Sequence, residues 1–379
     1  DSVVFENCTI LAGRNGSGKS NVMDALAFLA EAMTLPLQAV FDRRGGISAV
    51  RNRTSGRGYP PNLCLWVVFG PLNGTIGGGR YAFEVKALPN FGYQVVHEQC
   101  VVEGRDRHWF DRTRNGFSSN VKGLEPVLDP ASLALPVIGG EARFAAAVRT
   151  LSALRVHSID PAKLRDMQDP DSGTSLKPDG SNASSVLQEI ERNSKEDVRR
   201  IHEILSTIVP NTSAVRSKKH GNKLSLEFVQ EWGDHKKLRF EGFSMSDGTL
   251  RALGLLMAVY QRPKPSLLAI EEPEATIHPG AVGAVLDLLR HASRQMQVVI
   301  TTHSPEVLDA KWITDAQLRI VDWQEGATRV CPVSEAARTA IQRHLMGAGE
   351  LMRSGALVPE PLFQGQDDLH AFDLFQELA

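Results

Sequence analysis

Residues 13–20 are Gly13-Arg14-Asn15-Gly16-Ser17-Gly18-Lys19-Ser20, a stretch that matches every position of the phosphate-binding loop pattern G-x-x-x-x-G-K-[ST]. Residues 7–12 before it predict a short buried strand, and residues 22–29 after it have the apolar spacing of a helix. The alternative is a Gly- and Ser-rich turn that matches by chance. Because strand, loop and helix follow in the required order, we expect an α/β fold built around this loop.

The chemistry of the loop predicts a bound nucleoside triphosphate. Glycines let successive backbone N–H groups turn toward phosphates, and the N-terminus of the following helix adds positive potential. Lys19 would neutralise the β- and γ-phosphates, and the Ser20 hydroxyl would bind Mg²⁺. The predicted nucleotide-binding residues are Gly13, Arg14, Asn15, Gly16, Ser17, Gly18, Lys19, Ser20 and Asn21. ATP and Mg²⁺ are the expected ligands.

Composition narrows the class of protein. The chain has 379 residues, of which 42% are hydrophobic and 23% charged, as in ordinary globular proteins. The formal net charge of -2 gives no overall attraction to nucleic acid, so such contact would need local patches. The four scattered cysteines, and the absence of a long apolar run or a signal peptide, predict a cytoplasmic protein without a membrane segment. The start at Asp1, without Met, suggests a truncated N-terminus.

A coarse pass along the chain predicts an antiparallel β layer after the loop helix, then helices, a hairpin and a parallel sheet. We expect residues 169–185 to form a mobile loop. The expected strands are 63–69, 81–85, 93–97, 155–159, 212–216, 223–229, 267–270 and 298–301, and the expected helices lie within 141–154, 186–209, 252–260 and 336–346.

An acidic run follows the apolar strand 267–270 and predicts the remaining chemistry of the site. Glu271 is placed to hold the metal, and Glu272 is placed to orient and deprotonate a water molecule. A solvated acidic turn after a strand is the alternative. His303 follows the apolar strand 298–301 and could donate a hydrogen bond to the γ-phosphate, or it could be a structural histidine. We predict Lys19, Glu272 and His303 as the catalytic residues.

The segment Met245-Ser246-Asp247-Gly248-Thr249 precedes an apolar helix and forms a second candidate anion site. Alone, Ser246 could be a helix N-cap and nothing more. Together with the three other motifs, this segment resembles the ABC-type ATPase head of SMC, RecF and OLD-family proteins. The residues that carry the resemblance are 13–21, the run E-E-P-E-x-x-x-H-P from Glu271 to Pro279, and Thr302-His303-Ser304-Pro305, within residues 3–322.

The resemblance implies a P-loop NTPase head with a mixed or parallel sheet core, an antiparallel β layer in lobe I and an inserted helical lobe. It also implies that Ser246 and Gly248 close over the γ-phosphate bound by a second subunit, so that hydrolysis requires a homodimer or a higher homo-oligomer. Glu271 stands where the family usually has a metal-binding Asp, and residues 245–249 stand where it has the signature L-S-G-G-Q, so we expect turnover that is slow or depends on a partner. Gln168 is the candidate for the family's metal-binding Gln.

We divide the chain into residues 1–165 (lobe I), 166–262 (the insertion with residues 245–249), 263–330 (lobe II) and 331–379 (a C-terminal segment). The chain is most similar to stand-alone OLD-like ATPases of bacterial antiphage systems, which implies a separately encoded effector, such as a nuclease. The C-terminal segment could dock this effector or pack on its own head. Its apolar residues are Leu351, Leu357, Leu362 and Phe363.

The sequence is also compatible with two other functions. A RecF-like ATPase would clamp duplex DNA through basic clusters, although such a cluster is more often a solvated face. These clusters are Arg43-Arg44, residues 51–57, residues 105–114 and Lys218-Lys219. A non-hydrolysing scaffold would use ATP only to fix an assembly.

Overall fold

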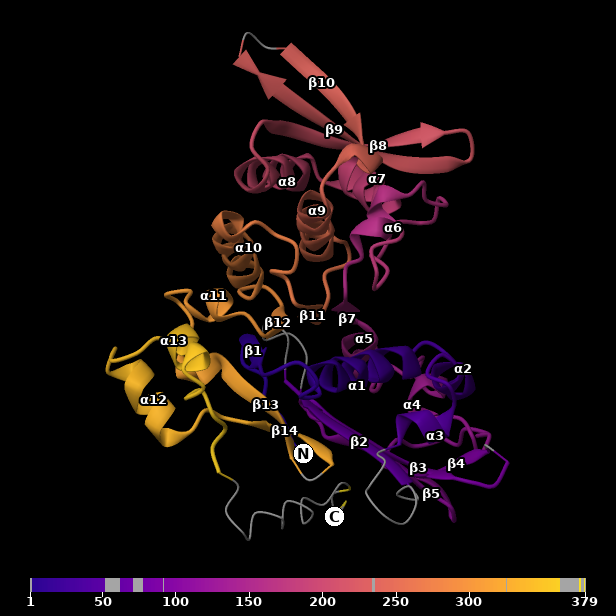
Figure 1. Ribbon diagram of the computed structural model, residues 1–379. Helices are drawn as coiled ribbons and strands as arrows, with labels where there is room; N and C mark the ends of the chain where they lie inside the picture. Colours follow the sequence, from indigo (N-terminus) through magenta and orange to yellow (C-terminus); the bar gives the residue numbers. More distant parts are fainter. Residues whose placement is uncertain are drawn as a thin grey trace.

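The computed structural model describes residues 2–51, 62–70, 78–90, 92–233, 236–324, 326–361, 375 and 378. A six-stranded sheet forms its centre, in the order β14-β13-β1-β12-β11-β7 (Figure 1). All neighbouring pairs are parallel except β13 and β14, which are antiparallel. The strands are β1 (Cys8–Ala12), β7 (Leu154–His157), β11 (Leu267–Glu271), β12 (Gln297–Thr302), β13 (Leu318–Gln324) and β14 (Ala327–Cys331).

Both faces of this sheet are covered, as the apolar runs of its strands require. In β1, Ile10 and Ala12 join the core beneath α9 (Asp247–Tyr260) and α10 (Pro279–Ala292). Leu11 points the opposite way, into the core that contains α1 (Lys19–Ala32) and α5 (Ala145–Ser152). The alternation follows from the two-residue period of a strand. The expected fold class, with a sheet that is parallel at its core, is confirmed.

The antiparallel layer of lobe I is also confirmed, and it has five strands where the sequence predicted three. Its strands, in spatial order, are β2 (Asn62–Phe69), β3 (Gly79–Ala87), β4 (Tyr93–Val102), β5 (His108–Thr113) and β6 (Gly116–Ser119). This sheet shares its core with α1, so the phosphate-loop helix lies between the two sheets. Short helices complete the layer: α2 (Leu37–Asp42), α3 (Ile47–Val50) and α4 (Ala134–Val137).

The insertion stands at the top of Figure 1, away from the five-stranded sheet. It contains α6 (Pro161–Arg165), α7 (Ala183–Asn193), α8 (Lys195–Ile208), β8 (Thr212–His220), β9 (Lys223–Trp232), β10 (Lys236–Glu241) and η3 (Gly242–Ser244). Its two ends meet, because Arg165 donates a hydrogen bond to the carbonyl of Met245 over 3.2 Å and forms an ion pair with Asp247.

The prediction of a mobile loop at residues 169–185 is wrong. Leu176 is buried in the core, and the Asn182 side chain donates to Asp171 over 2.9 Å and to the Ser175 carbonyl over 2.9 Å. The sequence suggested that the polar residues of this stretch would face water. They form hydrogen bonds with one another, and these bonds hold the loop in place.

The C-terminal segment packs on its own head over the residues that the structure describes. Leu351 in α13 (Ala348–Arg353) is only 4% exposed, and Leu357 packs against the same core. Leu351 is therefore not available for docking, Leu357 is partly buried, and Leu362 and Phe363 lie outside the described residues. The segment also contains α12 (Glu335–Gln342), and it follows α11 (Pro305–Leu308) and η4 (Asp315–Gln317). No helix among the described residues is long and apolar enough to cross a membrane.

Candidate functional site: the phosphate-binding loop and the acidic loop

The phosphate-binding loop connects β1 to α1 and has the backbone of an anion cradle. Gly16 and Gly18 have φ angles of 77° and 98°, in the left-handed region that glycine adopts without steric cost. No side chain caps the N-terminus of α1, so its positive end is open to a ligand. The Ser17 hydroxyl is buried without a hydrogen-bond partner. An orphaned donor beside an uncapped helix suits a bound phosphate.

Lys19 lies inside this loop, held by its backbone. Its Nζ donates to the carbonyls of Gly13 over 2.8 Å and Arg14 over 3.0 Å. Burial lowers the pKa of Lys19, and three carboxylates oppose the shift: Glu272, Glu274 and Glu271. The ammonium group of Lys19 therefore lies close enough to the carboxylates of residues 271–274 to be stabilised by their negative charge.

The register of the parallel strands brings the acids to the loop. Ala12 pairs with Thr302 across β1 and β12, and Glu271 pairs with Thr301 across β12 and β11. The Gly13 N–H also donates to the Thr302 carbonyl over 3.4 Å. Because the carboxyl ends of parallel strands meet at one sheet edge, Glu271 and the phosphate-binding loop share that edge.

Glu272 and His303 form a pair at the same edge. His303 Nδ1 lies 2.8 Å from Glu272 Oε1, and both side chains are partly exposed. Glu272 has a φ angle of 44°, which is unusual for a residue with a side chain. Its N–H binds both oxygens of Thr301, at 3.2 Å and 3.1 Å, which helps to hold this conformation. The pair gives the site a carboxylate oriented by an imidazole.

Glu274 is a third acid at the site, to which the sequence analysis assigned no role. Its Oε1 accepts a hydrogen bond from the Thr302 hydroxyl over 2.6 Å, while its Oε2 is buried without a partner. Burial raises the pKa of Glu274, and the Thr302 hydrogen bond opposes the shift. Glu274 therefore connects residues 271–277, which we call the acidic loop, to the end of β12.

The predicted signature segment, residues 245–249, starts α9. The Ser246 hydroxyl accepts a hydrogen bond from the Thr249 N–H over 3.2 Å, so Ser246 is a helix N-cap. At Gly248, a Cβ atom would lie 2.6 Å from the carbonyl oxygen of Thr276. Only glycine fits there, and the start of α9 therefore rests on the acidic loop. Within the described residues, no hydrogen bond joins Ser246 or Gly248 to residues 13–20.

Arg251 is another site residue that the sequence did not reveal. Its guanidinium donates to the carbonyls of Ile159 over 2.7 Å, Glu271 over 2.9 Å and Glu272 over 2.8 Å. Burial lowers the pKa of Arg251, and the carboxylates of Glu274, Glu272 and Glu271 oppose this shift. The sequence contained one signal for this role: a single arginine directly before the apolar run 252–260. A cation buried with such a run needs specific hydrogen-bond partners.

The prediction of Gln168 as a metal ligand needs correction. Its side-chain carbonyl accepts from the Ser184 N–H over 2.8 Å, and its amide donates to the Lys163 carbonyl over 3.0 Å. Its backbone bridges to Leu224 of the insertion. The side chain is buried and used to hold the insertion together, so it is not available to a cation beside Ser20 and Glu271.

The described residues contain no group of three or more His, Cys, Asp or Glu side chains arranged to hold a metal ion. Mg²⁺ in nucleotide sites binds through one or two protein oxygens together with phosphates and water, so such a site does not need a group of this kind. Ser20, at the first turn of α1, and Glu271, at the end of β11, are the oxygen donors that fit this arrangement.

Several of the basic clusters are compensated within the chain. Arg44 binds Asp24 and Glu31, Lys218 binds Glu227 and Glu241, and Arg112 lies 3.6 Å from Glu98. Residues 52–57 lie outside the described residues. Where a basic residue has such an acidic partner, the ion pair accounts for its charge without a bound nucleic acid.

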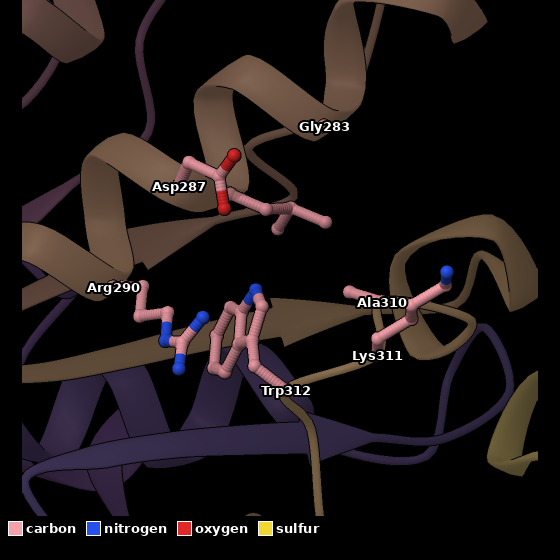
Figure 2. Close-up of a pocket in the computed structure, with 7 residues that line it drawn as sticks. Gly283, Asp287, Arg290, Ala310, Lys311 and Trp312 are labelled. Atoms are coloured by element: carbon pink, nitrogen blue, oxygen red, sulfur yellow. The ribbon is translucent and has the colours of Figure 1, made fainter.

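A separate hollow of about 430 Å³ lies between α10 and the segment after α11 (Figure 2). Arg290 lies over the ring of Trp312 at its floor. None of the predicted site residues lines this hollow, so it is distinct from the phosphate-binding site. Its lining residues are Gly283, Leu286, Asp287, Arg290, Ala310, Lys311 and Trp312.

The fold is that of an ABC-type ATPase head, as in SMC proteins. The chain belongs to the family described as "AAA domain, putative AbiEii toxin, Type IV TA system", whose model matches residues 8–87 and 162–309. The stretch between these two ranges contains most of the five-stranded sheet and β7.

One solved structure supports the fold, and a second is similar at a lower score. An Smc head bound to the C-winged helix domain of ScpA has a TM-score of 0.54 and 16% identity, over 89% of this chain and 94% of that chain. An Smc head with an extended coiled coil from Pyrococcus furiosus, bound to the C-terminal domain of ScpA, has a TM-score of 0.49 and 13% identity, over 90% and 94% of the two chains. At these identities the likeness concerns the fold alone. No curated protein matches the chain.

Proposed function

We propose that this protein binds Mg-ATP, dimerises head to head around two nucleotides and hydrolyses ATP to control a separate effector. The observation that carries this proposal is the convergence of Lys19 and the Glu272–His303 pair at one sheet edge. Phosphoryl transfer to water needs a cationic cradle, a metal and a base that orients the water. Lys19 would be part of the cradle, and Glu272 would be the base.

The proposal gives each residue of the site a role. Backbone N–H groups of the loop, the start of α1 and the ammonium of Lys19 would bind the phosphates. Ser20 and Glu271 would hold Mg²⁺, which neutralises charge on the phosphate oxygens when it is bound. Glu272 would accept a proton from the attacking water. His303, which contacts Glu272, would orient that carboxylate and donate to the γ-phosphate.

Dimerisation would complete the site. Ser246 and Gly248 make no hydrogen bond to the loop of their own chain in the part that the structure describes, and they start a helix whose N-terminus suits an anion. A second copy could place this helix end over the γ-phosphate. Turnover would then depend on the dimer, and the nucleotide state would set whether two heads are joined.

The proposal also includes a separately encoded effector that the ATPase controls. The family description names a toxin of a toxin–antitoxin system, which supports a role in bacterial defence, including antiphage defence. The similar Smc head is bound to a winged-helix domain of another protein, so a head of this fold can accept a partner. We propose a nuclease as the effector, because the family resemblance pairs such ATPases with nucleases.

The test compares Glu272→Gln with Glu196→Gln, a matched change at an exposed residue of α8. We expect Glu272→Gln to bind ATP as the wild type does, measured by calorimetry, and to release phosphate about 10²- to 10⁴-fold more slowly. Glu196→Gln should match the wild type in both measurements. Undiminished phosphate release by Glu272→Gln would refute the role of this base. ATP-dependent assembly without phosphate release by the wild type would favour a scaffold.

A further inference from the structure

The hairpin of β13 and β14 lies against the phosphate-binding loop. The Asn21 side chain donates to the Thr328 hydroxyl over 3.1 Å. A methyl group added to Gly18 would overlap the Thr328 side chain, so this threonine covers the loop just before α1. The structure thus places the middle of β14 at the end of the loop where the helix begins.

Trp323 stands next to this contact and is half exposed. It pairs directly with Thr328 across the antiparallel strands, so the two side chains project from the same face. Val321, two residues earlier in β13, lies on this face too, in the core shared with α1. Directly paired residues have Cβ atoms about 4.5–5.5 Å apart. The indole of Trp323, with 52% of its surface exposed, therefore lies on the α1 side of the sheet beside the loop.

The order of the strands gives the direction of a bound nucleotide. β12 and β11 lie on one side of β1 and carry His303 and Glu272. β13 and β14 lie on the other side of β1 (Figure 1). The nucleoside lies at the opposite end of the triphosphate from the γ-phosphate, so a γ-phosphate beside Glu272 favours a nucleoside farther from β11. That direction leads toward the hairpin that carries Thr328 and Trp323.

We propose that Trp323 is the surface on which the base of the nucleotide stacks, and that Thr328 sets the position of the hairpin over the loop. This inference rests on the proposed function. Stacking on an aromatic side chain uses the π-face that all bases share, so it adds affinity for the nucleoside without strong choice among purines.

The test separates the base from the phosphates by using two probes, ATP and inorganic tripolyphosphate, with Mg²⁺ and calorimetry. Trp323→Ala should bind ATP about ten- to a hundredfold more weakly than the wild type. Its affinity for tripolyphosphate should stay unchanged, because the loop is intact. Trp323→Phe should keep ATP affinity within a few fold. The control Trp232→Ala removes an exposed indole from the insertion and should change neither affinity.

Each other outcome overturns the inference. Unchanged ATP affinity in Trp323→Ala, with a wild type that binds ATP, would contradict the stacking role alone. An equal loss for ATP and tripolyphosphate would show that Trp323 supports the loop and does not contact the base. A wild type that binds neither probe would refute the proposed function together with the inference that rests on it.

Discussion

Arg251 donates a hydrogen bond to the backbone carbonyl of Glu272 over 2.8 Å, so the helix that follows the signature segment holds the acidic loop directly. The same guanidinium binds the carbonyl of Ile159, between β7 and α6. Glu272 and Thr276 in this loop have φ angles of 44° and 62°, a conformation that costs about 1–3 kcal/mol for a residue with a side chain. Arg251 and Gly248 supply contacts that hold the loop in this state.

Replacing Arg251 by Met should therefore slow hydrolysis and leave ATP binding almost intact. Hydrogen bonds from a charged group contribute about 1.5–3 kcal/mol each, so a misplaced Glu272 should lower kcat by about ten- to a hundredfold. Steady-state phosphate release gives kcat and KM separately. Arg262→Met removes an arginine that follows α9 and pairs with Asp197, and it should leave kcat unchanged. A raised KM with unchanged kcat in Arg251→Met would contradict a positioning role.

Two glycine-to-alanine changes should have opposite effects. At Gly248 the new methyl group would lie 2.6 Å from the Thr276 carbonyl, and the acidic loop would have to move. We expect a loss of about 1–3 kcal/mol in the free energy of unfolding, together with slower turnover. At Gly283, inside α10, the methyl group meets nothing within 4 Å, and the free energy of unfolding should rise by about 0.5–1 kcal/mol. Chemical denaturation measures both, and equal effects would refute the close contact at Gly248.

The buried His157 should make the protein less stable in acid. Burial lowers the pKa of His157 from 6.5 to about 4, and Arg155 acts in the same direction. Below pH 6.5 the unfolded chain binds a proton that the folded chain does not, so stability rises with pH in the window from about 4 to 6.5. As the pH falls through this window, the loss at this group should reach about 3 kcal/mol.

The variants His157→Gln and His291→Gln test this pH dependence. His157→Gln removes the titrating group, so its free energy of unfolding should change less between pH 7 and pH 4 than that of the wild type. His291 is exposed in α10, and its replacement should leave the wild-type pH profile unchanged. A His157→Gln profile parallel to the wild-type profile would show that acid sensitivity has another source.

The sequence predicted those parts of the site that depend on local pattern and on parallel strands. The loop around Lys19 is a contiguous motif, and Glu271 and His303 each follow an apolar strand, so their meeting at one sheet edge follows from the fold class. The five-stranded sheet was only partly predicted. The strands 108–113 and 116–119 are short, and β5 contains charged residues such as Asp111 and Arg112.

The rest of the site depends on contacts between distant segments, which a single sequence does not contain. Gln168 had the expected residue type, but its amide binds Ser184 and Lys163 inside the insertion. Trp323 comes near the loop only because β13 pairs with β14 in a particular register. Register depends on which side chains pack together in three dimensions, so it could not be predicted from the residues of β13 alone.

The ion pair between Arg165 and Asp247 closes the base of the insertion, so the chain leaves and returns to the head at almost one point. Segments with adjoining ends tolerate changes of length, because their growth does not pull on the structure beneath. Within this part, Leu187, Leu205 and Phe228 belong to the same core as α9 and α10, so a change of length suits only the exposed turn at Gly221 and Asn222. A fluorescent domain grafted at the tip between β8 and β9 would then report on this head without altering its chemistry.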